Sequence, residues 1–153
     1  MNRHLKPGGW VEFQCVSGEL ECDDGTLPRD STFSKYDRLL REAATSFGTP
    51  LEDPKRFKEW FEAAGFEGVT EKISPIPTSA WPKENRLRTI GRWEQENLLM
   101  GLEGISTRVF QRGLGWSPAE TQVFLVSVRK DIKNAAYHTY YNFYVVYAQK
   151  PLH

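Results

Sequence analysis

Three polar side chains in the sequence are candidates for acid–base chemistry, namely His138, Tyr140 and Gln14. Histidine gains and loses a proton near neutral pH, so His138 is the strongest candidate for a general base or acid. Tyr140 and Gln14 could donate hydrogen bonds to a reacting group. A simpler interpretation stays open for each: a histidine bonded in the core or on the surface, a tyrosine in ordinary packing, and an amide at the end of a strand.

A second group of side chains could bind a substrate. Rings at Trp81, Trp116 and Tyr141 could line a pocket for a bulky apolar molecule. Glu103 could act as a base or contact the substrate, and Arg92 could hold an anionic one. The alternatives are ordinary core packing for the rings, a helix cap for Glu103 and a solvated helix face for Arg92.

Other kinds of chemistry find no support in the sequence. Its two cysteines, Cys15 and Cys22, form neither a disulfide framework nor a metal-binding pattern, and no helix start or basic neighbour would activate their thiols. No spacing of His, Cys and Asp predicts a metal site. No Gly-x-Ser-x-Gly elbow indicates a hydrolase.

Composition predicts one globular domain spanning residues 1–153. Apolar residues make up 39% and charged residues 26%, and the 20 basic residues balance the 20 acidic ones. No long basic tract indicates nucleic acid or an anionic membrane as a partner. The sequence shows neither a secretory signal nor a run long enough to span a bilayer, so we expect a cytoplasmic protein with free thiols.

Periodicity predicts an α/β chain. Apolar and β-branched runs indicate three strands, at residues 10–16, 66–76 and 137–150. Apolar residues at three-four spacing indicate about five helices: 31–47, 53–64, two within 83–114 divided at Gly101 and Gly104, and 117–132. Residues 17–31 are polar, acidic and interrupted by glycine and proline, which is typical of a long loop.

Several short segments follow one another in the order typical of a known family. They are LKPGGWVE at 5–12, AGF at 64–66, WPK at 81–83, GLEG at 101–104, LGWS at 114–117 and the aromatic run at 137–151. Together they resemble the C-terminal half of class I S-adenosylmethionine-dependent methyltransferases, and in particular the fungal, LaeA-like branch of secondary metabolism. The resemblance implies a partial Rossmann-like fold with a mixed sheet, an antiparallel last strand and lid helices at about 83–133. It also implies that the candidate residues lie on the acceptor-substrate side of the site.

The methyl donor of that family is held by a glycine-rich turn after the first strand and by an acidic residue that ends the second. This sequence has no counterpart of either, because Gly8 and Gly9 precede a strand instead of following one. We therefore expect no S-adenosylmethionine site and no cofactor. We also expect the strand 10–16 to be a bare sheet edge that pairs with a second copy or with a partner chain.

Three functions fit these expectations. The first is an enzyme of fungal secondary metabolism that binds a bulky apolar small molecule and works without a donor, as a cyclase, an isomerase or a catalyst of a pericyclic step. A second is half of a methyltransferase whose partner supplies the donor site. The third is a non-catalytic, dimeric binding or regulatory module.

Overall fold

The computed structural model describes residues 4–48, 51 and 54–152, which divide into two compact units. We call them the sheet unit (Met1–Ser17, Glu52–Pro75 and Asn142–His153) and the helical unit (Gly18–Leu51 and Ile76–Tyr141). The expectation of a single domain stays a prediction. None of the helices within the described ranges is long and apolar enough to cross a lipid bilayer.

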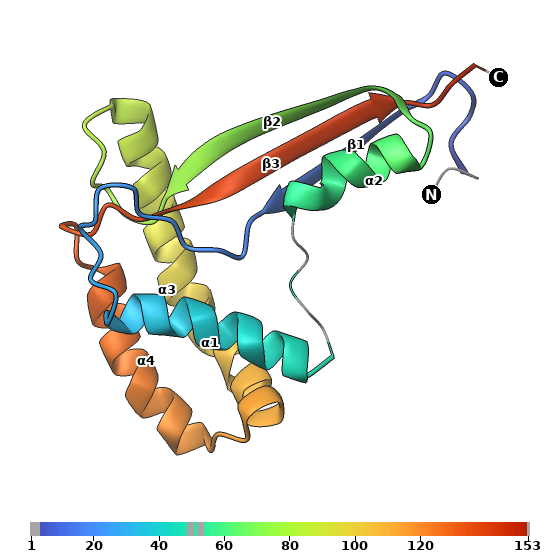
Figure 1. Ribbon diagram of the computed structural model, residues 1–153. Coiled ribbons are helices and arrows are strands. Elements are labelled where there is room, and N and C mark those ends of the chain that lie inside the picture. The colour runs from blue at the N-terminus through green and yellow to red at the C-terminus, as the bar shows by residue number, and fades with distance from the viewer. Residues whose placement is uncertain (1–3, 49–50, 52–53, 153) are drawn as a thin grey trace. The chain divides into compact units, whose positions relative to one another are not determined.

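The sheet unit is built on three strands: β1 (Trp10–Val16), β2 (Glu67–Pro77) and β3 (Tyr140–Gln149). The strand order is β1-β3-β2, and β1 pairs antiparallel with β3 from Trp10↔Gln149 to Val16↔Phe143. Figure 1 shows β1 and β2 pointing opposite to β3. The α/β class and the antiparallel last strand are therefore confirmed. Because β3 lies between β1 and β2, and both of these strands point opposite to it, both pairings of β3 are antiparallel.

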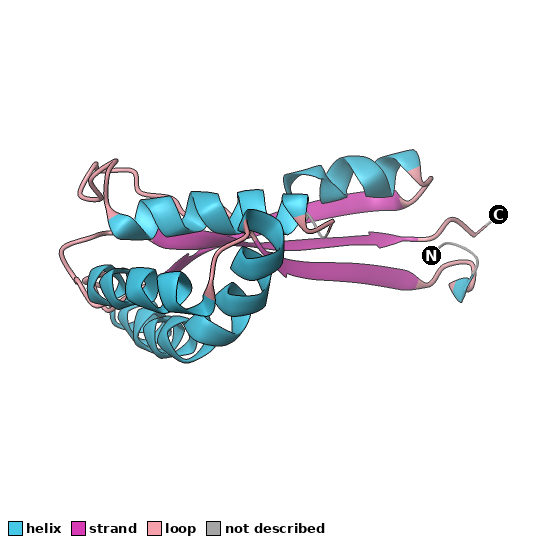
Figure 2. Ribbon diagram, turned by 90° about the horizontal axis from the view of Figure 1, so that it is seen from below, coloured by secondary structure: helices cyan, strands magenta, loops and turns pink. Residues whose placement is uncertain are grey.

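The 3-10 turn η2 (Pro54–Arg56) and the helix α2 (Phe57–Ala63) cover one face of this sheet (Figure 2). Side chains of β1 alternate between half-buried and exposed, as expected for a strand with one covered face. The ring of Phe13 lies edge-on to Phe57 and Phe61, with centroids 5.5 and 5.1 Å apart. Such edge-to-face contacts add to the stabilisation that comes from burying the rings.

Strand β1 lies at the edge of the sheet, since β3 is its neighbour on one side and no described strand pairs with the other. Trp10 is 59% exposed and Val16 is 45% exposed. Among the described strands β1 is therefore an edge strand, and its pairing with a second copy or a partner chain stays a prediction.

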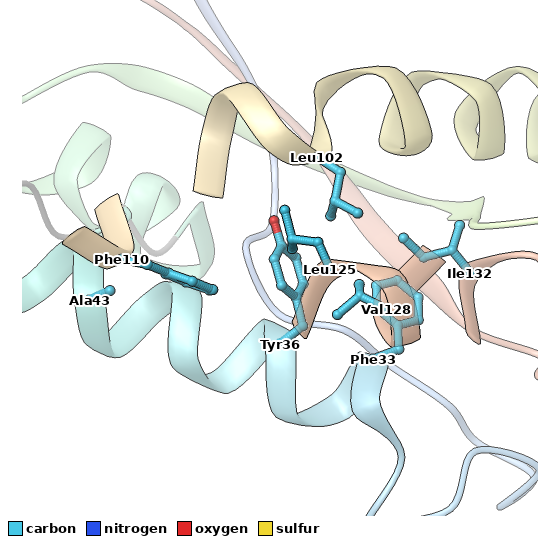
Figure 3. Packing of buried hydrophobic residues seen from close by; sticks show 8 residues of the cluster. All are labelled: Phe33, Tyr36, Ala43, Leu102, Phe110, Leu125, Val128 and Ile132. Carbon is cyan, nitrogen blue, oxygen red and sulfur yellow. The ribbon is translucent and has the colours of Figure 1, made fainter. Parts of the chain in front are cut away.

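The helical unit contains α1 (Thr32–Ser46), α3 (Asn85–Leu114) and α4 (Pro118–Ile132). Each begins at a side chain that accepts hydrogen bonds from the first turn: Ser31, Glu84 and Ser117. Ser117 and Glu120 form a capping box at the start of α4. The three helices bury one apolar cluster between them (Figure 3), made of Phe33, Tyr36, Ala43, Leu102, Phe110, Leu125, Val128 and Ile132.

The prediction that Gly101 and Gly104 divide the third helical block is wrong, because α3 runs unbroken through both. The chain therefore has four α-helices and one 3-10 turn among its described residues, where about five helices were expected. A glycine inside a helix costs only about 1 kcal/mol relative to alanine. Leu102 and Phe110 lie two turns apart on α3 and are fully buried against α1 and α4, so packing outweighs this cost.

Gly113 lets α1 and α3 approach each other closely. A Cβ atom at this position would lie 2.1 Å from the carbonyl oxygen of Ala43 on α1. Ala43 itself is fully buried. Only glycine fits this crossing without moving one of the two helices.

We predict opposite effects from the same substitution at two positions of α3. Gly113→Ala forces the new methyl group against the backbone of Ala43 and should lower the free energy of unfolding by about 2 kcal/mol or more. Gly104→Ala meets no atom within 4 Å and should raise it by about 0.5–1 kcal/mol. Urea denaturation of both variants measures this, and a neutral Gly113→Ala would contradict the close approach.

Candidate functional site

A loop of the helical unit lies against Tyr140, the first residue of β3, which belongs to the same unit, and this loop carries charged groups of the candidate site. We call residues 21–27 the acidic loop. Glu21 forms an isolated antiparallel bridge with Tyr140, with N–H···O distances of 2.9 and 3.0 Å in the two directions. This bridge holds the acidic loop beside His138 and Tyr140, which come from the other end of the sequence.

His138 and Asp24 form a close pair. Nδ1 of His138 lies 2.6 Å from Oδ2 of Asp24. The hydrogen bond from His138 is the main reason why the pKa of Asp24 lies well below its ordinary value, and bonds from the side chain and backbone of Thr26 lower it further. Asp24 is therefore ionised and can only accept, so the proton of this bond sits on Nδ1.

Trp81 fixes the plane of the imidazole ring. Its ring stacks on His138 with centroids 4.9 Å apart and an interplanar angle of 28°. The indole N–H donates to the carbonyl oxygen of Thr139 at 2.9 Å. The hydroxyl of Thr139, which is buried, is in turn hydrogen-bonded to that of Thr78. The stack therefore rests on a segment that is itself anchored.

The other ring nitrogen of His138 is available for chemistry. Nε2 makes no hydrogen bond to any residue that the structure describes, and the side chain is 37% exposed. An imidazole whose Nδ1–H donates a hydrogen bond to a carboxylate presents Nε2 as a proton acceptor. The carboxylate then stabilises the imidazolium that forms when Nε2 takes up a proton. The pair can thus act as a general base.

Tyr140 bonds to the neighbouring carboxylate. Its hydroxyl donates to Asp23 and lies 2.9 Å from both carboxylate oxygens. Burial, together with this hydrogen bond and the charge of Asp23, raises the pKa of Tyr140 to about 12. The phenol therefore keeps its proton at neutral pH, and its oxygen can accept a hydrogen bond from a ligand.

The remaining predicted site residues have other surroundings within their own units. Gln14 belongs to the sheet unit, where its amide donates to Glu12 at 2.6 Å. Tyr141 is 8% exposed, and burial raises its pKa well above the ordinary value, which is typical of a core tyrosine. Oε2 of Glu103 lies 3.7 Å from Nη2 of Arg129 in an ion pair, and Arg92 is exposed on α3.

Trp116 lines a separate groove of about 730 Å³ beside the start of α4. Its ring packs edge-on against Phe110 and Phe124, with centroids 5.2 and 5.3 Å away. The groove is bounded by residues of the segment 116–127, none of which belongs to the acidic loop. Trp116 therefore packs against the helix core and also lines this groove, and its role in ligand binding stays a prediction.

Sequence patterns did not point to Asp23, Asp24 or Thr26, which belong to the segment expected to be a polar loop. The only signal was a pair of carboxylates before a glycine turn. Nothing in a single sequence links Asp24 to His138, because the two are 114 positions apart.

A metal ion or the methyl donor would each need a particular arrangement of groups among the described residues. No group of three or more His, Cys, Asp and Glu side chains among them could hold a metal ion. Gly8 and Gly9 precede β1, and the first α-helix after that strand begins only at Thr32. The described part of the chain therefore does not match the glycine-rich turn at a helix start that would cradle the donor.

Comparison with known proteins places these features in context. No protein-family model matches the chain. The probable methyltransferase tdiE of Emericella nidulans is 35% identical over 147 residues, which are 96% of this chain and 46% of that protein. Methyltransferase pytC of Aspergillus terreus is 34% identical over 148 residues, which are 97% of this chain and 46% of that protein. The secondary metabolism regulator LAE1 of Cochliobolus heterostrophus is 33% identical over 150 residues, with 97% and 49% covered.

Among solved structures, phospholethanolamine N-methyltransferase 2 of Haemonchus contortus matches with a TM-score of 0.41 and 18% identity, covering 98% of this chain and 28% of that one.

The predicted resemblance is confirmed: the chain is similar, over nearly its whole length, to part of the fungal LaeA-like methyltransferases. It spans slightly less than half the length of the curated relatives that it matches. The chain is thus a methyltransferase-like segment related to proteins of fungal secondary metabolism.

The pair of His138 and Asp24 predicts a measurable pKa change. In His138→Ala the carboxylate of Asp24 loses its main stabilising bond, so its pKa should rise toward the ordinary aspartate value. The bonds from Thr26 remain and should still lower this pKa in part. Carbon NMR titration of side-chain carboxyl groups measures it. Glu120 is the internal control, because its pKa is lowered by Ser117 and should not move. An unchanged Asp24 would refute the pair.

Proposed function

We propose that this chain forms the acceptor side of a methyl-transfer site and that His138 is the general base acting on the acceptor. The observation that carries the proposal is the 2.6 Å bond between Nδ1 of His138 and Asp24, which leaves Nε2 as a proton acceptor. Similarity to tdiE and pytC, both of which are named methyltransferases, supports methyl transfer as the reaction class.

The chemistry assigned to this chain is removal of one proton. An acceptor hydroxyl or amine lies against Nε2 of His138 and gives up its proton as its oxygen or nitrogen becomes a nucleophile. Asp24 stabilises the imidazolium that results. The hydroxyl oxygen of Tyr140, which keeps its proton, accepts a hydrogen bond that orients the acceptor.

The donor-binding residues, in this proposal, lie outside the described segment. Two observations support this: the curated relatives are about twice as long as the matched part, and the described residues offer no glycine-rich turn at a helix start. No step of the chemistry above depends on them.

A chimera tests the role of His138. The part of tdiE that this chain does not match would be joined to this chain and given methyl-labelled S-adenosylmethionine with a panel of phenols, indoles and carboxylic acids. We expect label transfer to at least one acceptor class. His138→Gln should reduce the rate by about 10²–10⁴-fold, the usual contribution of a general base. Donor affinity, measured by calorimetry, should not change.

His4→Gln is the matched control, because His4 is an exposed histidine of the sheet unit and should leave the rate unchanged. Equal rates for the chimera and its His138→Gln variant would overturn the proposal. Conversion of an acceptor by the chain alone, without label, would support the donor-independent enzyme predicted from the sequence. Acceptor binding without any turnover would support the non-catalytic module.

The bare edge of β1 is the surface that we propose for the partner, either a second copy or the chain that carries the donor site. Exposed apolar side chains at both ends of this edge, Trp10 and Val16, support it. An added strand would extend the hydrogen-bonded ladder of the sheet at this edge.

Charges on this edge should block association. We expect the double variant Trp10→Lys and Val16→Lys to weaken binding of the partner at least about tenfold, since edge lysines oppose strand addition. Ile73→Lys is the control, because Ile73 is 50% exposed on the other edge strand, β2. Mass photometry of the chain alone, and mixed with the donor-side part of tdiE, measures association. A monomer that binds neither partner would contradict the prediction.

A further inference from the structure

Thr26 touches both members of the pair formed by His138 and Asp24. Its hydroxyl donates to Oδ1 of Asp24 at 2.8 Å, and its backbone N–H donates to the same oxygen at 3.1 Å. The hydroxyl oxygen also accepts the backbone N–H of His138 at 2.8 Å. One threonine side chain therefore links the acidic loop to the backbone of the residue that carries the imidazole.

The two oxygens of Asp24 have separate partners. Oδ1 takes both bonds from Thr26 and a longer one, at 3.5 Å, from the thiol of Cys22, and Oδ2 faces Nδ1 of His138. With Oδ1 held in this way, the carboxylate cannot turn about its own axis without losing these hydrogen bonds. The direction of Oδ2 is thereby fixed, although the side chain of Asp24 is 49% exposed to solvent.

We propose that Thr26 is a positioning residue that selects the tautomer of His138 with its proton on Nδ1 and so keeps Nε2 as the basic nitrogen. A neutral imidazole carries its proton on either nitrogen, and the hydrogen bond made by one nitrogen decides which. Through its bonds to Oδ1, Thr26 orients the carboxylate of Asp24 so that Oδ2 faces Nδ1. Through its bond to the backbone N–H of His138, it also holds that residue next to the carboxylate. The catalytic meaning of this role rests on the proposed function, whereas the tautomer itself does not.

The ring contact with Trp81 complements this role without replacing it. Stacking sets the plane of the imidazole but acts equally on both tautomers, because neither ring nitrogen bonds to the indole. Selection between the nitrogens thus depends on the carboxylate and on the group that orients it.

The test is a long-range ¹H–¹⁵N NMR spectrum of the full chain at alkaline pH, where a neutral imidazole reports its tautomer directly. We expect His138 of the unmodified chain to carry its proton on Nδ1. In Thr26→Val, which keeps the shape of the side chain and removes the hydroxyl, the ratio of the Nδ1–H to the Nε2–H form should fall roughly fivefold, as expected for the loss of a typical hydrogen bond. Thr26→Ser, which keeps the hydroxyl, should restore the original ratio.

Thr89→Val is the matched control, since the hydroxyl of Thr89 bonds to the carbonyl oxygen of Asn85 within α3 and to no other residue that the structure describes. It should leave the His138 spectrum unchanged. A proton on Nε2 in the unmodified chain, or an unchanged ratio in Thr26→Val, would overturn the inference. If Thr26→Val fails to fold, Thr26→Ala gives the same comparison, and the spectrum of the unmodified chain still decides the tautomer.

These spectra require neither donor nor acceptor, so the two proposals fail separately. A chimera that is insensitive to His138→Gln would remove the proposed base and leave the tautomer selection intact. A chimera that depends on His138 while Thr26→Val keeps the tautomer would remove only the positioning role. Where both hold, Thr26→Val should lower kcat and shift the pH profile with little change in KM.

Discussion

The hydrogen-bonded bridge between Glu21 and Tyr140 is the contact on which the candidate site depends. Two backbone hydrogen bonds hold the acidic loop against the start of β3, and every charged contact of the site is made across that junction. The side chains could not do this alone, because Asp23 and Asp24 are exposed and would otherwise stay hydrated. The backbone thus brings the groups together, and the side chains then define the chemistry.

A second constraint comes from the packing of the segment that carries Trp81 against α3. The segment with Thr78, Ser79 and Trp81 is held against α3, where a Cβ atom at Gly91 would lie 2.0 Å from the carbonyl oxygen of Ser79. Thr139 is tied to the same segment through Thr78 and Trp81. The imidazole of His138 therefore stacks on a ring whose position is set by the helix core. Such support from rigid elements is what a precisely placed proton acceptor needs.

Local signals predicted most of the elements and little of the site. The starts of α1 and α4 follow from their serine caps, and the strands from their apolar runs. The continuity of α3 was missed because glycine weakens a helix locally, whereas Leu102 and Phe110 stabilise it through contacts distant in sequence. The same limit applies to the site: His138 and Tyr140 were named from their chemistry, but their carboxylate partners lie more than a hundred positions away.

Gly91 and Gly113 let other backbone segments approach α3 closely near its two ends. Ser79 lies against Gly91, and Ala43 of α1 lies against Gly113. This gives the two positions diagnostic value when further sequences are compared. A homologous chain that keeps glycine at both can adopt the same crossings. A chain with a larger residue at either position must have moved the segment that carries Trp81, or moved α1, so its residue corresponding to His138 should not be assumed to have the same surroundings.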